Sequence, residues 1–503
     1  MVNYRIIYKI IGHLLLIEML FMLICGGMAF AYREDDVMAF ALSAAITAVV
    51  SLICKYFGRL SGNNLSRRDA YLVVTAVWVV FSLFGMLPFL IGGYIPNVTD
   101  AYFETMSGFT TTGATILDDV ECLPHGILFW RSLMQWIGGL GIVFFTIAVL
   151  PSMVGGSTKV FAAEVTGPFK SKMHPRLTTS AKWLWSIYLA LTCACFLAYW
   201  LAGMGWFDGL NYAMTTTATG GFAPHNDSAK YFISPVIEYI SLGFQFLAGM
   251  NFILLYAMVF KGQVLNLFRN SEFRVYLSIV LASTAFIMYM LITHNGYGLE
   301  KAFRCALFQV VSFITTTGLF NDDAGQWPHI TWIVLGICMF TGACAGSTSG
   351  GFKCIRGVMI IKVLRNEFRR ILHPNAVLPV KINGQNVPQD KIMGLVAFFA
   401  VYIIMAIITA TIMIAVGIDH TNAITIAFSC LSNVGPTLGT EIGPVMSWSS
   451  LPDNIKWICS LLMLMGRLEI MSVLCSSPAA IGRRTDGRLR LPVSALCRSD
   501  VCC

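Results

Sequence analysis

Four short polar stretches that each end in glycine constrain the fold of this chain more than any other feature of its sequence. Each stretch follows a half-length apolar run and lies between two long apolar segments. The four recur about 100 residues apart, which indicates one supersecondary unit repeated four times. They are residues 110–113 (TTTG), 217–220 (TATG), 315–318 (TTTG) and 432–435 (SNVG).

The long segments on either side of these stretches are membrane spans. The chain has 503 residues, of which 56% are hydrophobic and only 12% are charged, whereas soluble proteins carry about 25% charged residues. We therefore expect an all-α polytopic membrane protein, with four pseudo-symmetric units of span, pore helix, filter and span after two N-terminal helices. The expected spans are residues 6–31, 37–57, 70–91, 127–153, 183–201, 235–260, 276–293, 331–364, 392–416 and 455–474.

The half-length runs predict helices that enter the membrane and return. Roughly ten to fourteen helical residues rise about 15–21 Å, half of a hydrocarbon core of about 30 Å. The negative end of such a helix would face the loop that follows it. The runs are residues 100–110, 208–216, 300–314 and 419–431.

The polar loops themselves have the chemistry of a cation filter. Glycine can turn its peptide plane at positive φ, and successive carbonyl groups can then replace the water shell of a cation. An alternative is that Thr-Gly clusters are ordinary bends, which a single copy would favour; four copies in matching contexts favour a cation filter. The candidate filter residues are Thr111, Thr112, Gly113, Thr217, Ala218, Thr219, Gly220, Thr316, Thr317, Gly318, Asn433, Val434 and Gly435.

A glycine-rich interruption in the third unit is a candidate gate. Residues 342–351 carry four glycines and three hydroxyl residues inside an apolar span, and such a composition does not sustain a helix. A break at membrane depth has to face water or protein, so this segment could obstruct the path below the filter. The alternative is a packing kink between close helices. The candidate gating residues are Gly346, Ser347, Thr348, Ser349, Gly350 and Gly351.

The last span contains a second candidate gating feature, the permanent cation Arg467. A charge at membrane depth is costly and suggests a functional role. Arg467 could face the cation path as an electrostatic barrier or pair with the broken segment. The alternatives are a salt bridge to Glu469 or extension to the inner interface.

The distribution of lysine and arginine predicts the orientation. Basic residues gather in the connections between units, at about 55–68, 159–182, 261–274 and 353–391, with Lys353 and Arg356 among them. These connections and both termini are therefore expected in the cytoplasm. Acidic residues on the opposite face could form a vestibule that concentrates cations, or could merely follow the charge rule; they are Asp118, Asp119, Glu121, Asp227, Asp322, Asp323 and Glu441.

Three further features bear on partners and ligands. A hairpin is expected at Asn383-Gly384, in a cytoplasmic loop that could dock a soluble protein. The net charge of +8 reflects the basic loops and calls for no nucleic-acid partner. The 15 cysteines are scattered through apolar spans without the spacing of a metal site.

With these residues assembled, the chain resembles the Trk/Ktr/HKT superfamily of potassium transporters over about residues 6–474. The likeness is closest to the bacterial Trk-type channel subunit of the inner membrane. The stretches that carry it are residues 103–109 (FETMSGF), 130–139 (WRSLMQWIGG), 345–351 (AGSTSGG) and 466–469 (GRLE).

The resemblance implies filter glycines at Gly113, Gly220, Gly318 and Gly435, an intramembrane gating loop at 342–351 and a functional arginine at Arg467. It also implies K⁺ as the transported ion. In the plant branch of the superfamily, a serine at the first filter glycine accompanies sodium preference, and this chain has Gly113 at that position. A homodimer in membrane lipid is implied, on a cytosolic ring of nucleotide-binding regulatory subunits. ATP or NAD would bind that ring, since this chain has neither a Walker A nor a GxGxxG fingerprint.

The expected organisation is an N-terminal helix pair (1–62), pore unit 1 (63–155), pore unit 2 (156–262), pore unit 3 with the gating loop (263–372), pore unit 4 (373–474) and a basic tail (475–503) that does not resemble the family.

The chain is expected to be a transporter and not an enzyme. Coupled K⁺/Na⁺ or K⁺/H⁺ symport stays open. An intramembrane serine hydrolase using Ser347 or Ser349 is the alternative of another class.

Overall fold

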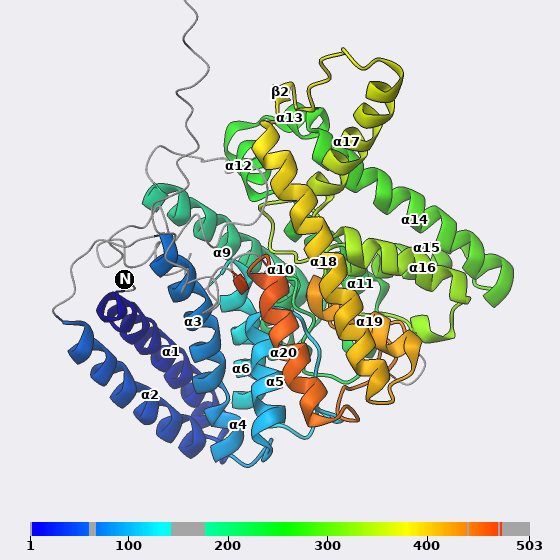
Figure 1. Ribbon diagram of the computed structural model, residues 1–503. Coiled ribbons are helices and arrows are strands. Elements are labelled where there is room, and N and C mark those ends of the chain that lie inside the picture. Colours follow the sequence, from blue (N-terminus) through cyan, green and yellow to red (C-terminus); the bar gives the residue numbers. More distant parts are fainter. Residues whose placement is uncertain (1–2, 60–66, 142–176, 440–441, 471–472, 475–503) are drawn as a thin grey trace, which may run out of the picture.

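The computed structural model describes residues 3–59, 67–141, 177–439, 442–470 and 473–474. In this part of the chain the fold is almost entirely helical, with a single two-stranded hairpin. The helices stand side by side around a common centre, and the hairpin lies at one end beside α17 and α13 (Figure 1). The expected all-α polytopic membrane fold is confirmed.

Two long helices precede the repeated units, as expected. Helices α1 (Tyr4–Tyr32) and α2 (Val37–Gly58) form an antiparallel pair, joined by a turn in which Arg33 is left-handed (φ 59°). Ser51 of α2 donates a hydrogen bond to the Gly12 carbonyl of α1 over 2.5 Å. Helix α1 also packs against α3 and α6, so the pair covers one side of the first unit (Figure 1).

Each unit contains a longer helix, then a half-length helix and at least one further helix. The first unit has α3 (Arg67–Gly85), α4 (Leu87–Ile91), α5 (Val98–Phe109) and α6 (His125–Gly139). The second has α9 (Leu177–Leu201), α10 (Trp206–Ala218), η1 (Ser228–Phe232), α11 (Pro235–Ala248), α12 (Phe252–Lys261) and α13 (Val264–Arg269). The third has α14 (Ser271–Asn295), α15 (Leu299–Ile314), η2 (Ala324–Gln326), α16 (His329–Thr341) and α17 (Cys354–Leu372). After the hairpin of β1 (Lys381–Ile382) and β2 (Gln385–Asn386), the fourth has α18 (Gln389–Ala415), α19 (His420–Ser432) and α20 (Asp453–Arg467).

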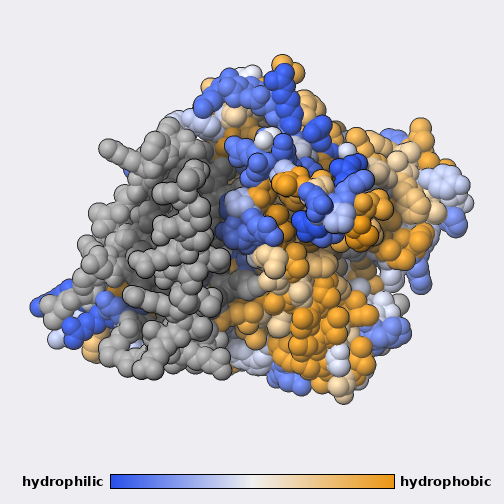
Figure 2. Space-filling model, turned by 45° about the horizontal axis from the view of Figure 1, so that its top comes forward, coloured by the Kyte–Doolittle hydropathy of each residue, from blue (hydrophilic) through white to orange (hydrophobic). Residues whose placement is uncertain are grey.

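The long helices are apolar and expose large hydrophobic side chains. In the described part of the chain, six helices are long and apolar enough to cross a membrane, and a bent pair would make a seventh. Ile24 of α1 and Leu52 of α2 are 54% and 61% exposed. Figure 2, in which the top of Figure 1 is turned toward the reader, shows hydrophobic residues gathered over the right-hand part of the face, with hydrophilic residues at its top and centre and along its lower edge. Such a surface suits lipid contact, and the chain is a multi-pass membrane protein.

The expected continuous span at 235–260 is wrong. Helices α11 and α12 meet at an angle of 104° across a break at residues 249–251. Asn251 caps α12 by accepting from the Ile253 amide over 2.9 Å, and such a cap starts a new helix. The carbonyl of Gly249 accepts from the Cys344 amide of the third unit over 3.1 Å. The bend is therefore stabilised by contact with another unit, which no local pattern reveals.

The last span is shorter than expected, because α20 ends at Arg467 instead of continuing to residue 474. Glu469 and Ile470 follow with left-handed backbone, and the Ile470 amide donates to the Met465 carbonyl over 2.7 Å. In contrast, the break in the third unit is confirmed, since α16 ends at Thr341 and α17 begins at Cys354. The second half of the expected span at 127–153, most of the basic connection at 159–182, Glu441 and the tail at 475–503 lie outside the described residues.

Candidate ion-conduction site

The four half-length helices end in the same backbone turn. In each, one residue adopts a left-handed conformation with φ between 54° and 57°, and the next amide donates to the carbonyl five residues earlier over 2.8–3.1 Å. This is the Schellman arrangement that closes a helix C-terminus. The left-handed residues are Thr111, Thr219, Thr316 and Asn433. Three of them are threonines, for which this conformation is strained, and such strain clusters at functional sites.

The glycines after these turns form a closed ring with carbonyl groups of the neighbouring units. All four have positive φ, between 79° and 91°. A Cβ added to any of them would overlap a backbone oxygen of the next unit. The glycine and oxygen pairs are Gly113 with Gly220, Gly221 with Thr317, Gly318 with Val434, and Gly435 with Thr112. The four loops thus touch one another around a single axis, and the fourth loop closes the ring on the first.

The second unit differs from the expected register by one residue. The sequence prediction aligned Gly220 with Gly113, but the glycine with positive φ is Gly221, at 85°. The reason is that α10 continues through Ala218, so its terminal turn falls at Thr219. Gly220 therefore corresponds to Thr112 of the first loop.

Most of the thirteen predicted filter residues lie where they were expected from the sequence. Eleven lie in the ring loops, and two lie in the last turn of α10 because of this shift in register. Those two are Thr217 and Ala218.

A buried ion pair between α5 and α6 lies next to the first loop and binds the backbone that follows it. Arg131 of α6 and Glu104 of α5 are 2% and 0% exposed, and Arg131 Nε donates to Glu104 Oε1 over 2.9 Å. The carboxylate of Glu104 also accepts from the Ile116 amide over 3.0 Å, just after the loop. The guanidinium of Arg131 lies 4.2 Å from the centre of the Phe222 ring of the second loop. This pair therefore joins two units next to the ring.

Gln135, one turn further along α6, braces the second loop. Its Nε2 donates to the Gly220 carbonyl over 2.7 Å, and its Oε1 accepts from the Phe222 amide over 3.1 Å. The side chain thus fixes the peptide planes on both sides of Gly221. Sequence reasoning placed Arg131 and Gln135 in a distinctive stretch but gave neither a role at the loops, because only the fold brings α6 against the second unit.

An outer cavity of about 440 Å³ lies next to the ring, and its lining includes all four positive-φ glycines. Of the acidic residues expected to form a vestibule, only Asp118 lines this cavity in the described part of the chain. Hydrogen bonds from Ser447 and Ser449 hold the pKa of Asp118 below its usual value. Asp322 instead accepts from Tyr297 and Trp327 over 3.0 and 3.1 Å, and Asp323 caps η2, which are structural roles.

The glycine-rich segment between α16 and α17 packs against the ring loops from the other side. Thr348 donates from its hydroxyl to the Thr217 carbonyl over 3.1 Å, and the Gly350 amide donates to the Thr316 hydroxyl over 2.7 Å. A Cβ on Gly350 would overlap the Ser432 carbonyl at the end of α19. The segment therefore contacts three of the four half-length helices or their loops.

Arg467, at the end of α20, joins this segment to the ring. Its Nη1 donates to the Thr111 hydroxyl over 3.0 Å and to the Thr348 carbonyl over 3.1 Å. Its Nη2 donates to the carbonyls at the end of α6, those of Gly138 and Gly139, over 2.5 and 2.6 Å. These carbonyl acceptors include one from the broken segment, as the sequence hypothesis proposed.

The alternative partner, Glu469, forms an ion pair with another residue, Arg356 of α17, over 2.5 Å. Arg356 and Lys353 are 5% and 2% exposed, so they do not belong to a solvated cytoplasmic connection, as their place in the basic run suggested. Sequence spacing could not reveal this, because both residues follow directly on the segment that folds back into the molecule.

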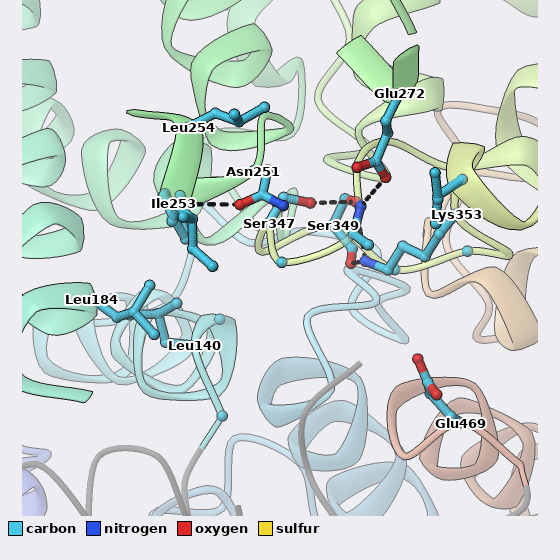
Figure 3. A pocket seen from close by; sticks show the side chains of 18 of the residues that line it. Leu140, Leu184, Asn251, Ile253, Leu254, Glu272, Ser347, Ser349, Lys353 and Glu469 are labelled. Carbon is cyan, nitrogen blue, oxygen red and sulfur yellow. Dashed lines mark hydrogen bonds between the residues drawn. The ribbon is translucent and has the colours of Figure 1, made fainter. Parts of the chain in front are cut away.

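An inner cavity of about 400 Å³ lies beneath the segment and is lined by Lys353, Arg467, Glu272 and Glu469. Figure 3 shows Glu272, Ser349 and Lys353 converging on one wall. The Lys353 ammonium donates to the Ser349 carbonyl, and Glu272 accepts from the Ala345 amide over 2.6 Å. The broken segment is therefore bound by charged side chains at both of its ends.

These features define an all-α polytopic membrane transport protein, built from four re-entrant units that meet in a ring of backbone groups. A family model described as TrkH, cation transport protein, matches residues 37–479. The chain belongs to this family of cation transport proteins.

Individual relatives agree over nearly the whole chain. The Trk system potassium uptake protein TrkH of Salmonella typhimurium is 36% identical over 477 residues, covering 94% of this chain and 98% of that protein. The Trk system potassium uptake protein TrkG of Escherichia coli is 32% identical over 473 residues, covering 93% of this chain and 97% of that protein. The crystal structure of the potassium transporter TrkH from Vibrio parahaemolyticus superposes with a TM-score of 0.85 at 34% identity, covering 95% of this chain and 99% of that one.

Proposed function

We propose that this protein conducts K⁺ across the cytoplasmic membrane through a filter formed by the four ring loops. The closed ring of glycines and carbonyls is the observation that carries the proposal. Carbonyl dipoles from four sides replace the water shell of a monovalent cation without adding charge. The ring residues have no ionic side chain, which suits rapid passage better than tight binding. The names of the relatives, potassium uptake proteins, support K⁺ as the cargo.

The negative ends of the half-length helices strengthen this proposal. Helices α5, α10, α15 and α19 contain 12, 13, 16 and 13 residues, and each ends at a ring loop. The C-terminal end of a helix carries about half a negative charge. Four such ends stabilise a cation at the ring in a medium where water cannot do so.

The glycine-rich segment at 342–351 acts as the gate in this proposal. The positively charged Arg467 holds the segment in its closed position. The segment lies between the ring and the inner cavity, on the path that an ion would take. Arg467 keeps its charge under all conditions, so it opposes a cation while it is bound to Thr348. Withdrawal of the segment would remove both the obstruction and this charge.

The remaining parts of the proposal concern topology and partners. Both termini and the hairpin face the cytoplasm, following the distribution of basic residues. The protein works as a homodimer in membrane lipid and is controlled by a cytosolic nucleotide-binding regulatory subunit. K⁺ is its cargo and it needs no catalytic cofactor.

The competing functions have less support. The Ser347 hydroxyl is bonded to the Cys344 carbonyl over 2.7 Å and to the Ser349 hydroxyl over 2.9 Å, and neither group can act as a base toward Ser347. Lys353 donates to the Ser349 hydroxyl over 3.3 Å and also to the Ser349 carbonyl, so in this arrangement it acts as a donor. Coupled symport would require a second ion. Flux of K⁺, Rb⁺ and Na⁺ into proteoliposomes, with and without a membrane potential, separates these functions. The proposal requires K⁺ and Rb⁺ flux driven by the potential alone; flux that needs a proton or sodium gradient would contradict it.

A further inference from the structure

The side chain of Asn383 attaches the cytoplasmic hairpin to the N-terminus of α14. Asn383 and Gly384 form its two-residue turn with φ of 48° and 81°, the conformation that favours an Asn-Gly sequence. The turn itself does not require the asparagine oxygen. That oxygen accepts two hydrogen bonds from Ser271, one from its amide over 2.9 Å and one from its hydroxyl over 2.8 Å.

Glu272, the next residue of α14, is hydrogen-bonded to the gate segment at Ala345. Glu272 is 5% exposed, and its carboxylate accepts from the Ala345 amide over 2.6 Å. Ser271 and Glu272 belong to one capped turn, because Asn270 accepts from the Glu272 and Phe273 amides over 2.9 and 3.3 Å. A capped first turn is rigid, so a displacement at Ser271 moves Glu272 with it. Two adjacent residues therefore connect the hairpin on one side to the gate segment on the other.

The hairpin is also attached to the helix that leaves the gate. Lys362 of α17 donates to the Lys381 carbonyl over 2.7 Å, and Asn366 donates to the Leu378 carbonyl over 3.0 Å. Ile382 of β1 is only 4% exposed and lines the inner cavity together with Asn383. Since α17 begins directly after the gate segment, the hairpin is bonded to the elements that hold both ends of the gate. Figure 1 shows β2 beside α13 and close to α17, at the end of the molecule.

We infer that the hairpin is the element through which an event at the cytoplasmic face sets the position of the gate. The connection runs from Asn383 to Ser271, and from Glu272 to Ala345. Asn383 and Glu272 are positioning residues in this scheme, because they act on the gate segment without lining the ring. The inference rests on the proposed gating role of residues 342–351, and it adds the input of that gate.

The test uses the full-length protein in planar lipid bilayers with K⁺ on both sides. Asn383→Gly keeps the left-handed turn, which glycine adopts freely, and removes only the acceptor. Asn383→Asp restores an acceptor oxygen. Asn386→Ala is the control in the same hairpin, at an exposed position. Glu272→Ala breaks the second half of the connection, and the double variant Asn383→Gly/Glu272→Ala tests whether the two act in series.

The expected result is an open probability raised about fivefold in Asn383→Gly, as for loss of a typical hydrogen bond. Asn383→Asp and Asn386→Ala should match the wild type, and the double variant should not exceed Glu272→Ala. The K⁺/Na⁺ permeability ratio should not change in any variant, because none of the substituted residues belongs to the ring, and an unchanged ratio shows that each variant has folded with the ring intact.

Three results would overturn the inference, and each has a different meaning. If Glu272→Ala raises the open probability while Asn383→Gly leaves it at the wild-type value, the gate exists and the hairpin does not control it. If neither variant, nor deletion within 346–351, alters the open probability, the proposed gate itself fails. If the increase in open probability of the double variant equals the product of the increases in the two single variants, Asn383 and Glu272 act on the gate independently, and not in series.

Discussion

Arg467 donates a hydrogen bond from Nη1 to the hydroxyl of Thr111, 3.0 Å away, and so connects the last helix to the left-handed residue of the first ring loop. The same nitrogen donates to the Thr348 carbonyl over 3.1 Å. One guanidinium therefore touches both the proposed filter and the proposed gate. The four acceptors described here, one hydroxyl and three carbonyls, are neutral groups.

Replacement of this arginine should increase leak. Two unit charges at about 4 Å repel by roughly 4 kcal/mol at an effective dielectric of about 20. Arg467→Ala removes both this barrier and the bond to Thr348, so K⁺ flux per inserted molecule should rise at least about tenfold. Arg467→Lys, which keeps the charge and cannot make the paired bonds, should give a smaller rise. Equal normalised flux in wild type and Arg467→Ala would exclude the barrier role.

Thr348 offers a finer test of the gate. Its hydroxyl donates to the Thr217 and Ala248 carbonyls over 3.1 and 3.3 Å. Thr348→Val keeps the shape and removes the donor, so basal open probability should rise about fivefold. Ser347→Ala is the matched control, because the Ser347 hydroxyl bonds only within the segment in the contacts described here. If Thr348→Val and Ser347→Ala have the same open probability, the bonds from the Thr348 hydroxyl do not hold a gate closed, and the segment is a packing kink.

The buried pair of Glu104 and Arg131 should affect both stability and selectivity. Removing one partner of a buried pair typically costs about 3–5 kcal/mol, because the other charge is left unpaired. Glu104→Gln should therefore lower the thermal midpoint of the detergent-solubilised protein and reduce the K⁺/Na⁺ ratio. Glu104→Gln/Arg131→Met should recover part of the midpoint. A wild-type ratio in a destabilised Glu104→Gln protein would show that the pair supports folding alone.

Asp118 should make conduction depend on external pH. Hydrogen bonds from Ser447 and Ser449 lower its pKa, so the carboxylate stays charged below the usual value of about 4. Ser447→Ala/Ser449→Ala removes these bonds, and the pKa should return upward. As external pH falls toward about 4, K⁺ conductance of the double variant should decline at a higher pH than that of the wild type. The two proteins should conduct alike at neutral pH, and coincident profiles would remove Asp118 from the vestibule.

The repeated pattern was sufficient to predict the fold and most of the ring. Long apolar segments and short polar loops depend on local composition, and so the four units and the break after Thr341 were predicted correctly. The register of the second loop was not, since the sequence there offers two adjacent glycines and only the end of α10 selects Gly221.

Other features depend on contacts between distant units. The bend at Asn251 is stabilised by the bond between the Gly249 carbonyl and the Cys344 amide of the third unit. Lys353 is buried because the glycine-rich segment before it folds back into the molecule. From the sequence alone no role was assigned to Glu272, because its bond to Ala345 forms only when the third unit folds back on itself. Local periodicity carries no information about such contacts.

The central claim is that backbone carbonyls around the four glycines select the ion, and reversal potentials under K⁺/Na⁺ bi-ionic conditions test it most directly. Gly113→Ser and Gly221→Ser each place a Cβ against a carbonyl of the next unit. Gly203→Ser is the control, because Gly203 also has positive φ (97°) but has open space around it. The account predicts a lower K⁺/Na⁺ permeability ratio in both ring variants and a wild-type ratio in the control. A wild-type ratio in both conducting ring variants would contradict it.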